Sequence, residues 1–382
     1  MHGQVRKFWQ DRLLQTWQSV PIAWLAGVRR VGKTTLARSL PNHTYLNCDL
    51  PSVVERLADP ETLLRAVDTP IVVFDEVHQL ADPSRVLKIA ADEFPHLRIL
   101  ATGSSTLAAT HKFRDTLTGR KRTVHLVPVL VTELADFGIA DLRHRLQRGG
   151  LPAALLSAVA DPSGCAEWLD SYFARDVQEL FRVEKRGAYL QLCELLLRQS
   201  GGLYEASSLA RATALSRQTV ATYLDALQAT LVVTLVRPFH GGGRQEVLQQ
   251  PKVYGFDTGF VAWVRGWGEL RPADCGQLWE HVVLEAIQAT VGVPVPHFWR
   301  DRQQREVDFV LPWRDGRVDA IECKWSADAL SPKNLVEFRK LHPTGRNFAV
   351  VPGARESYER NLGGLAVQVC DIAGLVRQLV QA

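Results

Sequence analysis

The chain has 382 residues and a mass of 42.6 kDa, which suits roughly two to four domains. Hydrophobic residues make up 46% of it, enough for each domain to build a core, and 45 basic residues face 41 acidic ones. The resulting net charge of +4 excludes a uniformly basic nucleic-acid coat but leaves room for a local basic face. Arginine accounts for 35 of the basic residues, which fits a phosphate-handling protein, although high genomic G+C content produces the same excess.

The cysteine pattern and the first residues bear on location. The six cysteines are Cys48, Cys165, Cys193, Cys275, Cys323 and Cys370. They form no CxxC pair and no cysteine–histidine cluster at zinc spacing, as expected for reduced thiols. Residues 1–10 are polar and aromatic, and no run approaches the ~18 apolar residues of a membrane span. We expect a cytoplasmic protein without membrane contacts.

The first 130 residues alternate short apolar runs with helical stretches, which predicts βα units around a parallel sheet. The expected strands are 22–26, 44–49, 71–75, 98–102 and 124–127. From about 130 to 187, leucine and alanine recur at three- and four-residue spacing, which predicts a helical lid.

The second half shows two further patterns. Between 189 and 257, a helix, a helix–turn–helix and a hairpin with a glycine-rich tip follow one another, which is the order of a winged helix. From 277 onward, helix and strand patterns alternate and predict a smaller α/β unit, with strands near 297–300, 306–311, 318–325 and 348–351 and a helix near 333–341. We therefore predict an α/β protein with these domains: a P-loop ATPase core at 1–130, a helical lid at 131–188, a winged helix at 189–262 and the last α/β domain at 263–382.

A phosphate-binding motif follows the first predicted strand. Residues 27–34 read GVRRVGKT, which matches GxxxxGK[ST] between an apolar run and a helix-forming stretch. In this motif, backbone N–H groups surround the β-phosphate, Lys33 spans the β- and γ-phosphates, and Thr34 gives a hydroxyl to Mg²⁺. The residues expected to bind the nucleotide and its Mg²⁺ are Gly27, Arg29, Arg30, Val31, Gly32, Lys33, Thr34, Thr35 and Asp75.

Two acids and two serines lie at the ends of two predicted strands. The strand at 71–75 ends in Asp75 and is followed by Glu76. Asp75 would hold Mg²⁺ through water, and Glu76 would polarise the attacking water. A solvated turn is the alternative for this acid pair. Ser104 and Ser105 follow the strand at 98–102, where either would orient the water or cap the next helix.

Hydrolysis also needs a cation near the γ-phosphate, and a basic run offers one. The run contains Arg114, Arg120, Lys121 and Arg122. One of these residues would act in trans as an arginine finger, with a solvated basic loop as the alternative. The predicted catalytic residues are Lys33, Glu76, Ser104, Arg120 and Arg122.

Several short motifs, taken in order, carry a family resemblance. They are residues 27–35, 74–76, 102–105, 119–120, 149–152, 251–254, 306–309 and 321–324. The chain resembles bacterial and archaeal AAA+ superfamily P-loop ATPases that join an AAA-14 type domain to a DUF-4143 type, restriction-endonuclease-like C-terminal domain. The resemblance implies ATP binding, a helical lid, a winged helix, a nuclease-like fold and a homo-oligomer, with a ring as one arrangement.

The helix–turn–helix pattern at 207–224 offers nucleic-acid contacts. Inward-facing apolar residues leave Arg217, Gln218, Thr219 and Thr222 on the exposed face of the second helix, and Arg244 lies at the glycine-rich wing. These side chains suit phosphates and base edges, so we expect DNA contacts here. The alternative is a winged helix that contacts protein or relays ATPase motion.

Carboxylates and a lysine gather in the last domain. Glu322 and Lys324 share one face of a strand, and Asp308 would lie on the neighbouring strand. The set looks like the PD-(D/E)xK pattern of nucleases, with Glu280 as its helical acid, and would hold a divalent metal for phosphodiester hydrolysis. The alternative is a relic fold kept for DNA binding or packing, with Glu322 and Lys324 as an ordinary ion pair.

The combined prediction is an AAA-type protein that uses ATP and Mg²⁺, forms a homo-oligomer, and couples its nucleotide state to DNA binding or remodelling. Two alternatives stay open. The first is an ATP-regulated, Mg²⁺-dependent DNA nuclease. The second is a nucleotide-controlled switch or scaffold that binds protein.

Overall fold

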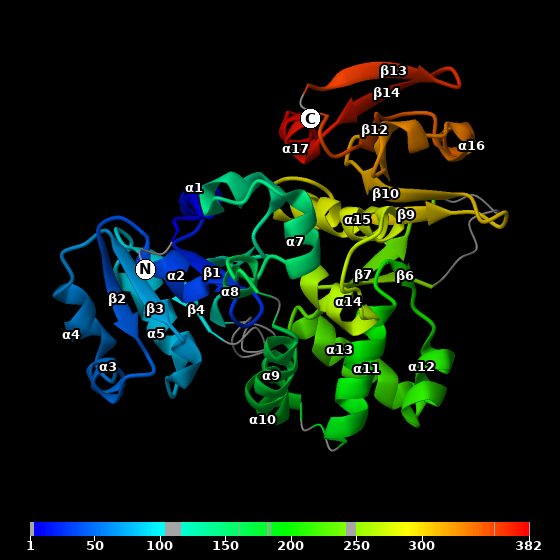
Figure 1. Cartoon of the computed structure of the whole chain (residues 1–382). Coiled ribbons are helices and arrows are strands. Elements are labelled where there is room, and N and C mark those ends of the chain that lie inside the picture. Colours follow the sequence, from blue (N-terminus) through cyan, green and yellow to red (C-terminus); the bar gives the residue numbers. More distant parts are fainter. Residues whose placement is uncertain are drawn as a thin grey trace.

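Two β-sheets organise the chain, one in each half (Figure 1). The computed structural model describes residues 4–103, 116–159, 161–181, 183, 185–241, 250–354 and 356–381. The first sheet lies among the blue and cyan elements, and the second runs through the green, yellow and red elements. The protein is therefore an α/β protein with an N-terminal parallel sheet and a C-terminal mixed sheet.

The first sheet has five parallel strands in the order β2-β3-β4-β1-β5. The strands are β1 (Ile22–Ala26), β2 (His43–Asn47), β3 (Ile71–Asp75), β4 (Arg98–Thr102) and β5 (Lys121–His125). The predicted limits of β1, β3 and β4 are confirmed. The fifth strand begins three residues earlier and ends two residues earlier than predicted, because it is an edge strand whose first residues need not be apolar.

Short helices surround this sheet. They are α1 (Lys7–Trp17), α2 (Lys33–Arg38), α3 (Pro51–Arg56), α4 (Pro60–Arg65), η1 (Val77–Gln79) and α5 (Pro83–Glu93). The sequence analysis did not predict α1, whose Trp9, Leu13 and Trp17 are buried. These three side chains fix the first helix to the sheet.

The segment after β5 is helical, as predicted. Its elements are η3 (Val131–Phe137), α7 (Leu142–Arg148), α8 (Pro152–Leu155), α9 (Pro162–Tyr172), the π-helical turn η4 (Phe173–Val177) and α10 (Gln178–Phe181). Its described residues contain no strand.

The second sheet has nine strands in the order β13-β14-β12-β11-β10-β9-β7-β8-β6. Its strands are β6 (Gly202–Leu203), β7 (Val233–Pro238), β8 (Lys252–Gly255), β9 (His297–Arg300), β10 (Glu306–Pro312), β11 (Val318–Cys323), β12 (Asn347–Val350), β13 (Tyr358–Leu362) and β14 (Leu365–Cys370). The helices with it are α11 (Arg186–Arg198), α12 (Ala206–Thr213), α13 (Arg217–Ala229), α14 (Thr258–Arg265), α15 (Pro272–Ala289), η5 (Ala327–Ala329), α16 (Lys333–Leu341) and α17 (Ile372–Val380).

One pairing joins two units that the sequence analysis kept apart. Strand β7 pairs with β8 in the predicted hairpin and also pairs in parallel with β9 of the last α/β unit. The hairpin and the last unit therefore share one continuous sheet. The hairpin β13–β14 was also missed, because four of the five residues of β13 are exposed and show no strand-like alternation.

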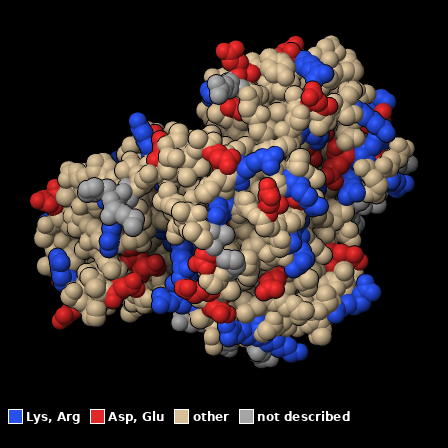
Figure 2. Space-filling model, in the orientation of Figure 1, with Lys and Arg blue, Asp and Glu red and all other residues tan. Residues whose placement is uncertain are grey.

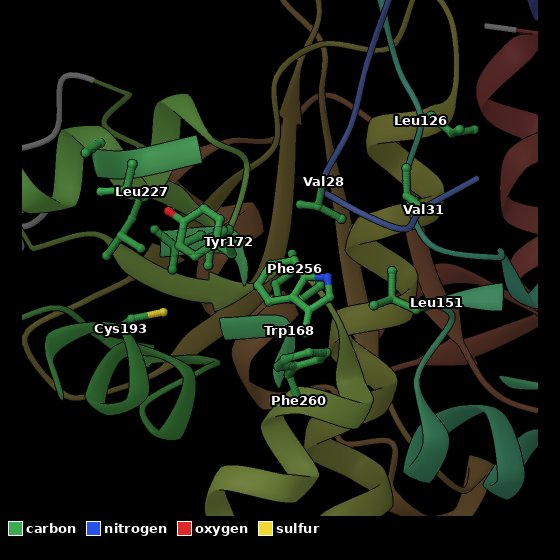
Figure 3. Close-up of a cluster of buried hydrophobic side chains, with 14 of the residues drawn as sticks. Val28, Val31, Leu126, Leu151, Trp168, Tyr172, Cys193, Leu227, Phe256 and Phe260 are labelled. Atoms are coloured by element: carbon green, nitrogen blue, oxygen red, sulfur yellow. The ribbon is translucent and has the colours of Figure 1, made fainter. Parts of the chain in front are cut away.

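A buried aromatic cluster connects the two halves (Figure 3). The Trp168 ring of α9 stacks on Phe256, with ring centroids 4.7 Å apart, and contacts Phe260 edge-on. Val28 and Val31, from the loop after β1, belong to the same cluster. The candidate phosphate loop thus shares a hydrophobic cluster with residues of the second half of the chain. No helix among the described residues is both long and apolar enough to cross a bilayer.

Candidate functional site

The side chain of Lys33 folds back onto the backbone of the loop between β1 and α2. Gly32 has a φ of 100° in this loop, a left-handed conformation that favours glycine. The Lys33 Nζ donates to the carbonyl oxygens of Gly27 at 2.8 Å and Val28 at 3.2 Å. Burial lowers the pKa of Lys33, while the nearby Glu76 raises it in part. No carboxylate of the described residues forms an ion pair with this ammonium group, so its charge is available to an anion.

Asp75 lies beside Thr34 at the carboxyl edge of the first sheet. The Thr34 hydroxyl donates to Asp75 Oδ2 at 2.9 Å, and the Tyr45 and Thr102 hydroxyls also donate to this carboxylate. A hydroxyl next to a carboxylate supplies the oxygen ligands that Mg²⁺ prefers, so these residues fit the predicted ion. The sequence analysis missed Tyr45. Burial and the hydrogen bond to Asp75 raise the pKa of Tyr45 to about 12.

Glu76 follows in a left-handed conformation, with φ 55°. Such a conformation is costly for a residue other than glycine and is common where function requires it. Its backbone N–H donates to Thr102 Oγ1 at 3.0 Å, and its Oε2 lies 3.2 Å from His78 Nδ1. Burial raises the pKa of Glu76, while the charges of His78 and Lys33 lower it in part. The structure therefore brings Lys33, Asp75 and Glu76 to one edge of the sheet.

The arginines of the loop are held by the helical segment. Arg29 donates to Ser171 Oγ at 3.1 Å and lies 3.4 Å from Asp176, while Arg30 lies 2.8 Å from Glu167. The Trp168 indole also donates to the Arg29 carbonyl at 3.0 Å. The side chains of Arg29 and Arg30 therefore contact the helical segment in this conformation. Thr35 is exposed on α2.

The candidate arginine fingers lie far from this edge. The Arg120 carbonyl accepts from the N–H of Ile22, the first residue of β1, and Arg122 pairs with Ala23. Both arginines therefore lie near the amino-terminal ends of the parallel strands, whereas the phosphate loop lies at their carboxyl-terminal ends. Arg120 also donates to both carboxylate oxygens of Asp92, at 2.6 and 3.0 Å. Ser104, Ser105 and Arg114 lie outside the described residues.

A second charged group, the acid–lysine cluster, lies in the second half. It consists of Glu280, Glu306, Asp308 and Glu322 together with Lys252 and Lys324. Lys324 Nζ lies 3.1 Å from Asp308 Oδ2 and 2.5 Å from Glu322 Oε2. Lys252 Nζ lies 2.9 Å from Glu280 Oε1 and 2.7 Å from Glu306 Oε1. All four predicted residues of the nuclease-like set therefore come together.

That this cluster holds a metal ion stays a prediction. Among the described residues, no group of three or more histidine, cysteine, aspartate or glutamate side chains is arranged to hold a metal ion. Lysine ammonium groups stand between the carboxylates instead. The sequence analysis missed Lys252, Glu306 and Tyr254, whose hydroxyl donates to Glu280. The only signal for two of them was the motif at 251–254, which carried no assigned role.

Only some of the predicted DNA-contacting side chains are fully exposed to solvent. Arg217 and Gln218 are exposed in the first turn of α13, and Thr222 is exposed one turn later. Thr219 is half-buried, and its hydroxyl lies 2.8 Å from that of Ser216, which caps the helix. Thr219 is therefore only partly exposed. Arg244 lies outside the described residues.

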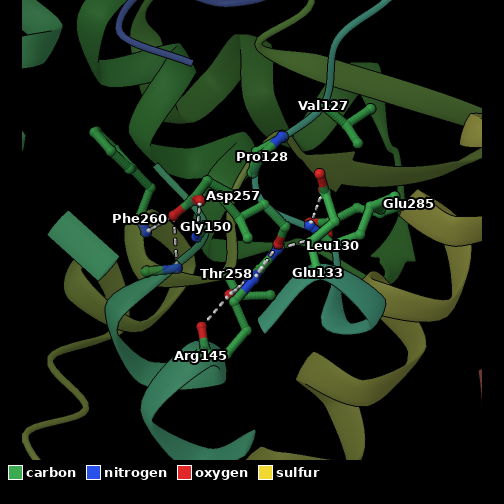
Figure 4. Close-up of polar contacts among 12 residues, drawn as sticks. Val127, Pro128, Leu130, Glu133, Arg145, Gly150, Asp257, Thr258, Phe260 and Glu285 are labelled. Atoms are coloured by element: carbon green, nitrogen blue, oxygen red, sulfur yellow. Dashed lines mark hydrogen bonds and ion pairs between the residues drawn. The ribbon is translucent and has the colours of Figure 1, made fainter. Parts of the chain in front are cut away.

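A buried polar network joins the loop after β5 to the second half (Figure 4). Arg145, fully buried, donates to the Val129 carbonyl at 2.7 Å and to Thr258 Oγ1 at 2.8 Å, and pairs with Glu285 of α15 at 2.7 Å. Beside it, Asp257 accepts from the N–H of Gly150 at 2.7 Å. No sequence motif pointed to Arg145.

Arg6 holds the same loop from the other side. It pairs with Glu133 and donates to the carbonyls of Val127 at 3.0 Å and Pro128 at 3.3 Å. A longer contact of 3.5 Å reaches the carbonyl of Val31 in the phosphate loop. Residues 127–129 are thus fixed between the phosphate loop and α15.

The strand order, the loop after β1 and the acids after β3 define a P-loop nucleotide-binding protein. Comparison with family models agrees: residues 19–135 match an AAA domain, residues 139–271 match a domain of unknown function (DUF8612), and residues 275–370 match another (DUF4143). The chain therefore consists of an AAA domain followed by DUF8612 and DUF4143 domains. The AAA-14 and DUF4143 resemblance is confirmed, and DUF8612 covers segments that the sequence analysis divided at residue 188.

Two curated relatives match most of the chain. They are uncharacterized protein Rv2008c of Mycobacterium tuberculosis (strain ATCC 25618 / H37Rv) and uncharacterized protein Mb2031c of Mycobacterium bovis (strain ATCC BAA-935 / AF2122/97). Each is 29% identical over 326 residues, which cover 82% of this chain and 72% of the relative.

Two solved structures overlap part of the fold. A DNA polymerase III gamma subunit-related protein of Thermotoga maritima covers 58% of this chain and 97% of its own at 9% identity, with a TM-score of 0.24. A Drosophila ORC structure determined bound to DNA covers 69% of this chain and 88% of its own at 13% identity, with a TM-score of 0.27. Neither overlap is close enough to assign a function.

Proposed function

We propose that this protein binds and hydrolyses ATP at the AAA domain and couples its nucleotide state to DNA through the second half. The observation that carries the ATPase proposal is the convergence of Lys33, Thr34, Asp75 and Glu76 on one sheet edge. Lys33 binds the β- and γ-phosphates, Thr34 and Asp75 hold the ion, and Glu76 orients and polarises the attacking water. Bound Mg²⁺ neutralises charge that develops on the phosphates.

The test separates binding from hydrolysis. Glu76→Gln should bind ATP with wild-type affinity but lose turnover, because the amide cannot polarise the water. Glu93→Gln, a change to an exposed glutamate at the end of α5, is the matched control and should keep both properties. Wild-type turnover in Glu76→Gln contradicts the role of Glu76.

A continuous set of contacts supports coupling between the halves. Residues 127–129 contact the phosphate loop through Arg6 and contact α15 through Arg145, and α15 also carries Glu280 of the acid–lysine cluster. Coupling requires that DNA affinity differ between the nucleotide states. DNA affinity should therefore be measured without nucleotide, with ADP, and with ATP in Glu76→Gln. Equal affinity in all three states contradicts the coupling.

The element order α11-β6-α12-α13-β7-β8 supports a winged helix with α13 as its DNA-contacting helix. On the face in Figure 2, basic side chains are interspersed with acidic ones rather than gathered into one field. Contact through a few residues such as Arg217 would give weak, salt-sensitive binding without strong sequence preference. If no DNA form binds, the scaffold alternative replaces this part of the proposal.

We also propose a homo-oligomer in which Arg120 or Arg122 of one subunit meets the ATP of another. Their place near the amino-terminal ends of the strands, away from the phosphate loop, supports a role in trans. Arg120→Ala and Arg122→Ala should bind ATP without hydrolysing it, and mixing either with Lys33→Ala should restore activity. Specific activity that is independent of protein concentration argues against this assembly.

A further inference from the structure

The acid–lysine cluster is built across a domain boundary. Lys252 and Tyr254 lie on β8, within the segment that matches DUF8612, whereas Glu280, Glu306 and Asp308 lie within the segment that matches DUF4143. The last domain alone therefore lacks one of the two lysines. This lysine is also the more buried one, with 4% of its side chain exposed against 27% for Lys324.

Three cations neutralise most of the charge of the cluster without a metal ion. They are Lys252, Lys324 and Arg300, whose guanidinium lies 3.5 Å from Glu306. The acids are Glu280, Glu306, Asp308 and Glu322, and each of them forms an ion pair with at least one of these cations. Little negative charge is therefore left for a divalent ion.

Lys252 also bridges two acids that come from different elements. Its ammonium group contacts one acid on α15 and one on β10, at 2.9 and 2.7 Å, as a cation shared by two carboxylates does. Binding of a metal there would push Lys252 out and leave a charged group buried without a partner, which is costly.

We propose that Lys252 takes the place of a divalent cation in the acid–lysine cluster. The cluster then fixes strand β8 to the last α/β unit and binds no metal while Lys252 is in position. This assignment accounts for the missing metal geometry and is independent of the proposed ATPase function. It also predicts that the wild-type protein cuts no DNA with Mg²⁺ or Mn²⁺.

Titration of the nucleotide-free, full-length protein with Mn²⁺, followed by electron paramagnetic resonance, tests the proposal. The wild type and Lys252→Arg, which keeps the charge, should bind no stoichiometric Mn²⁺. Lys252→Met should bind one Mn²⁺ at least ~10-fold more tightly than the wild type, because the net negative charge of the cluster increases. Adding Asp308→Asn to Lys252→Met should weaken this binding again.

Two results would overturn the proposal. One is Mn²⁺ binding by the wild type that Asp308→Asn abolishes, which would restore a metal-dependent site. The other is a folded Lys252→Met, or the more conservative Lys252→Gln, that gains no Mn²⁺ affinity. Reductive methylation of the wild type gives a test without substitutions at Lys252. Lys252 should react far more slowly than the exposed Lys340, whether or not Mg²⁺ is present, and equal labelling contradicts the proposal.

Discussion

Lysine is central to both charged regions of this protein, and its partners differ. At the phosphate loop, Lys33 is held by two backbone carbonyls, which carry only partial charges. In the acid–lysine cluster, Lys252 and Lys324 each lie between two carboxylates. The first arrangement positions a positive charge without neutralising it, so an anionic ligand is needed to complete the site. The second neutralises most of its charge internally, which suits a structural joint.

Removing Lys33 should give the largest effect on activity. Lys33→Met should lower ATP turnover by ~10³-fold or more, because the charge that stabilises the transferring phosphate is lost. The melting temperature should change little, since no carboxylate of the described residues forms an ion pair with this lysine and would be left unpaired. Steady-state hydrolysis measures the loss, with Lys88→Met on the exposed face of α5 as the control. Retained turnover in Lys33→Met contradicts the assignment of the ATP site.

Removing Lys252 should have the opposite profile. Lys252→Met should cost about 3–5 kcal/mol of unfolding free energy, because buried carboxylates lose their cation. ATP turnover per folded molecule should stay within about twofold of wild type, as Lys252 lies outside the phosphate site. Urea unfolding checks the first expectation, with the surface change Lys340→Met costing at most ~1 kcal/mol. A Lys252→Met protein of wild-type stability would show that the cluster does not fix strand β8 to the last α/β unit.

The buried Arg145–Glu285 pair should make the free energy of unfolding depend on pH. Burial raises the pKa of Glu285 to about 7 despite Arg145. The folded state therefore holds a proton that the unfolded chain loses near its ordinary value of 4.5, and stability falls as pH rises from about 4.5 to 7. Glu285→Gln lacks this dependence, so its stability relative to wild type should rise by up to ~3 kcal/mol across that window. Unfolding curves of both proteins at several pH values measure the difference, and parallel curves would mean that Glu285 is ionised in the fold.

The smallest effect is expected at the proposed DNA contact. Arg217→Glu should weaken DNA binding by ~5- to 10-fold at low salt and make its salt dependence shallower, because a phosphate contact becomes repulsive. Arg56→Glu, on the exposed surface of α3, carries the same charge change and should have less effect. Fluorescence anisotropy at several salt concentrations compares the two variants. Equal affinities would remove α13 from the contact surface.

The residues of the predicted ATP site come together because its parts are local in the sequence. The loop at 27–34 is contiguous and lies between a strand and a helix, and Asp75 and Glu76 directly follow another strand. The carboxyl ends of parallel strands meet at one edge, so these residues had to converge once the strands formed. The sequence also predicted three of the four acids of the second cluster but not Glu306. Glu322 and Lys324 were recognised because residues two apart in a strand share one face.

Only the tertiary structure decided what those acids contact. Lys252 is 28 residues from Glu280, and Arg145 is 140 residues from Glu285, so neither pair follows from a local period. Both pairs depend on how β7 joins β9 and how α15 packs between the halves, which no single segment encodes. A lysine and an acid distant in sequence neutralise each other only when the fold removes both from water and brings them within about 3 Å. That contact gives the acids of the predicted metal site a lysine partner that no local pattern indicated.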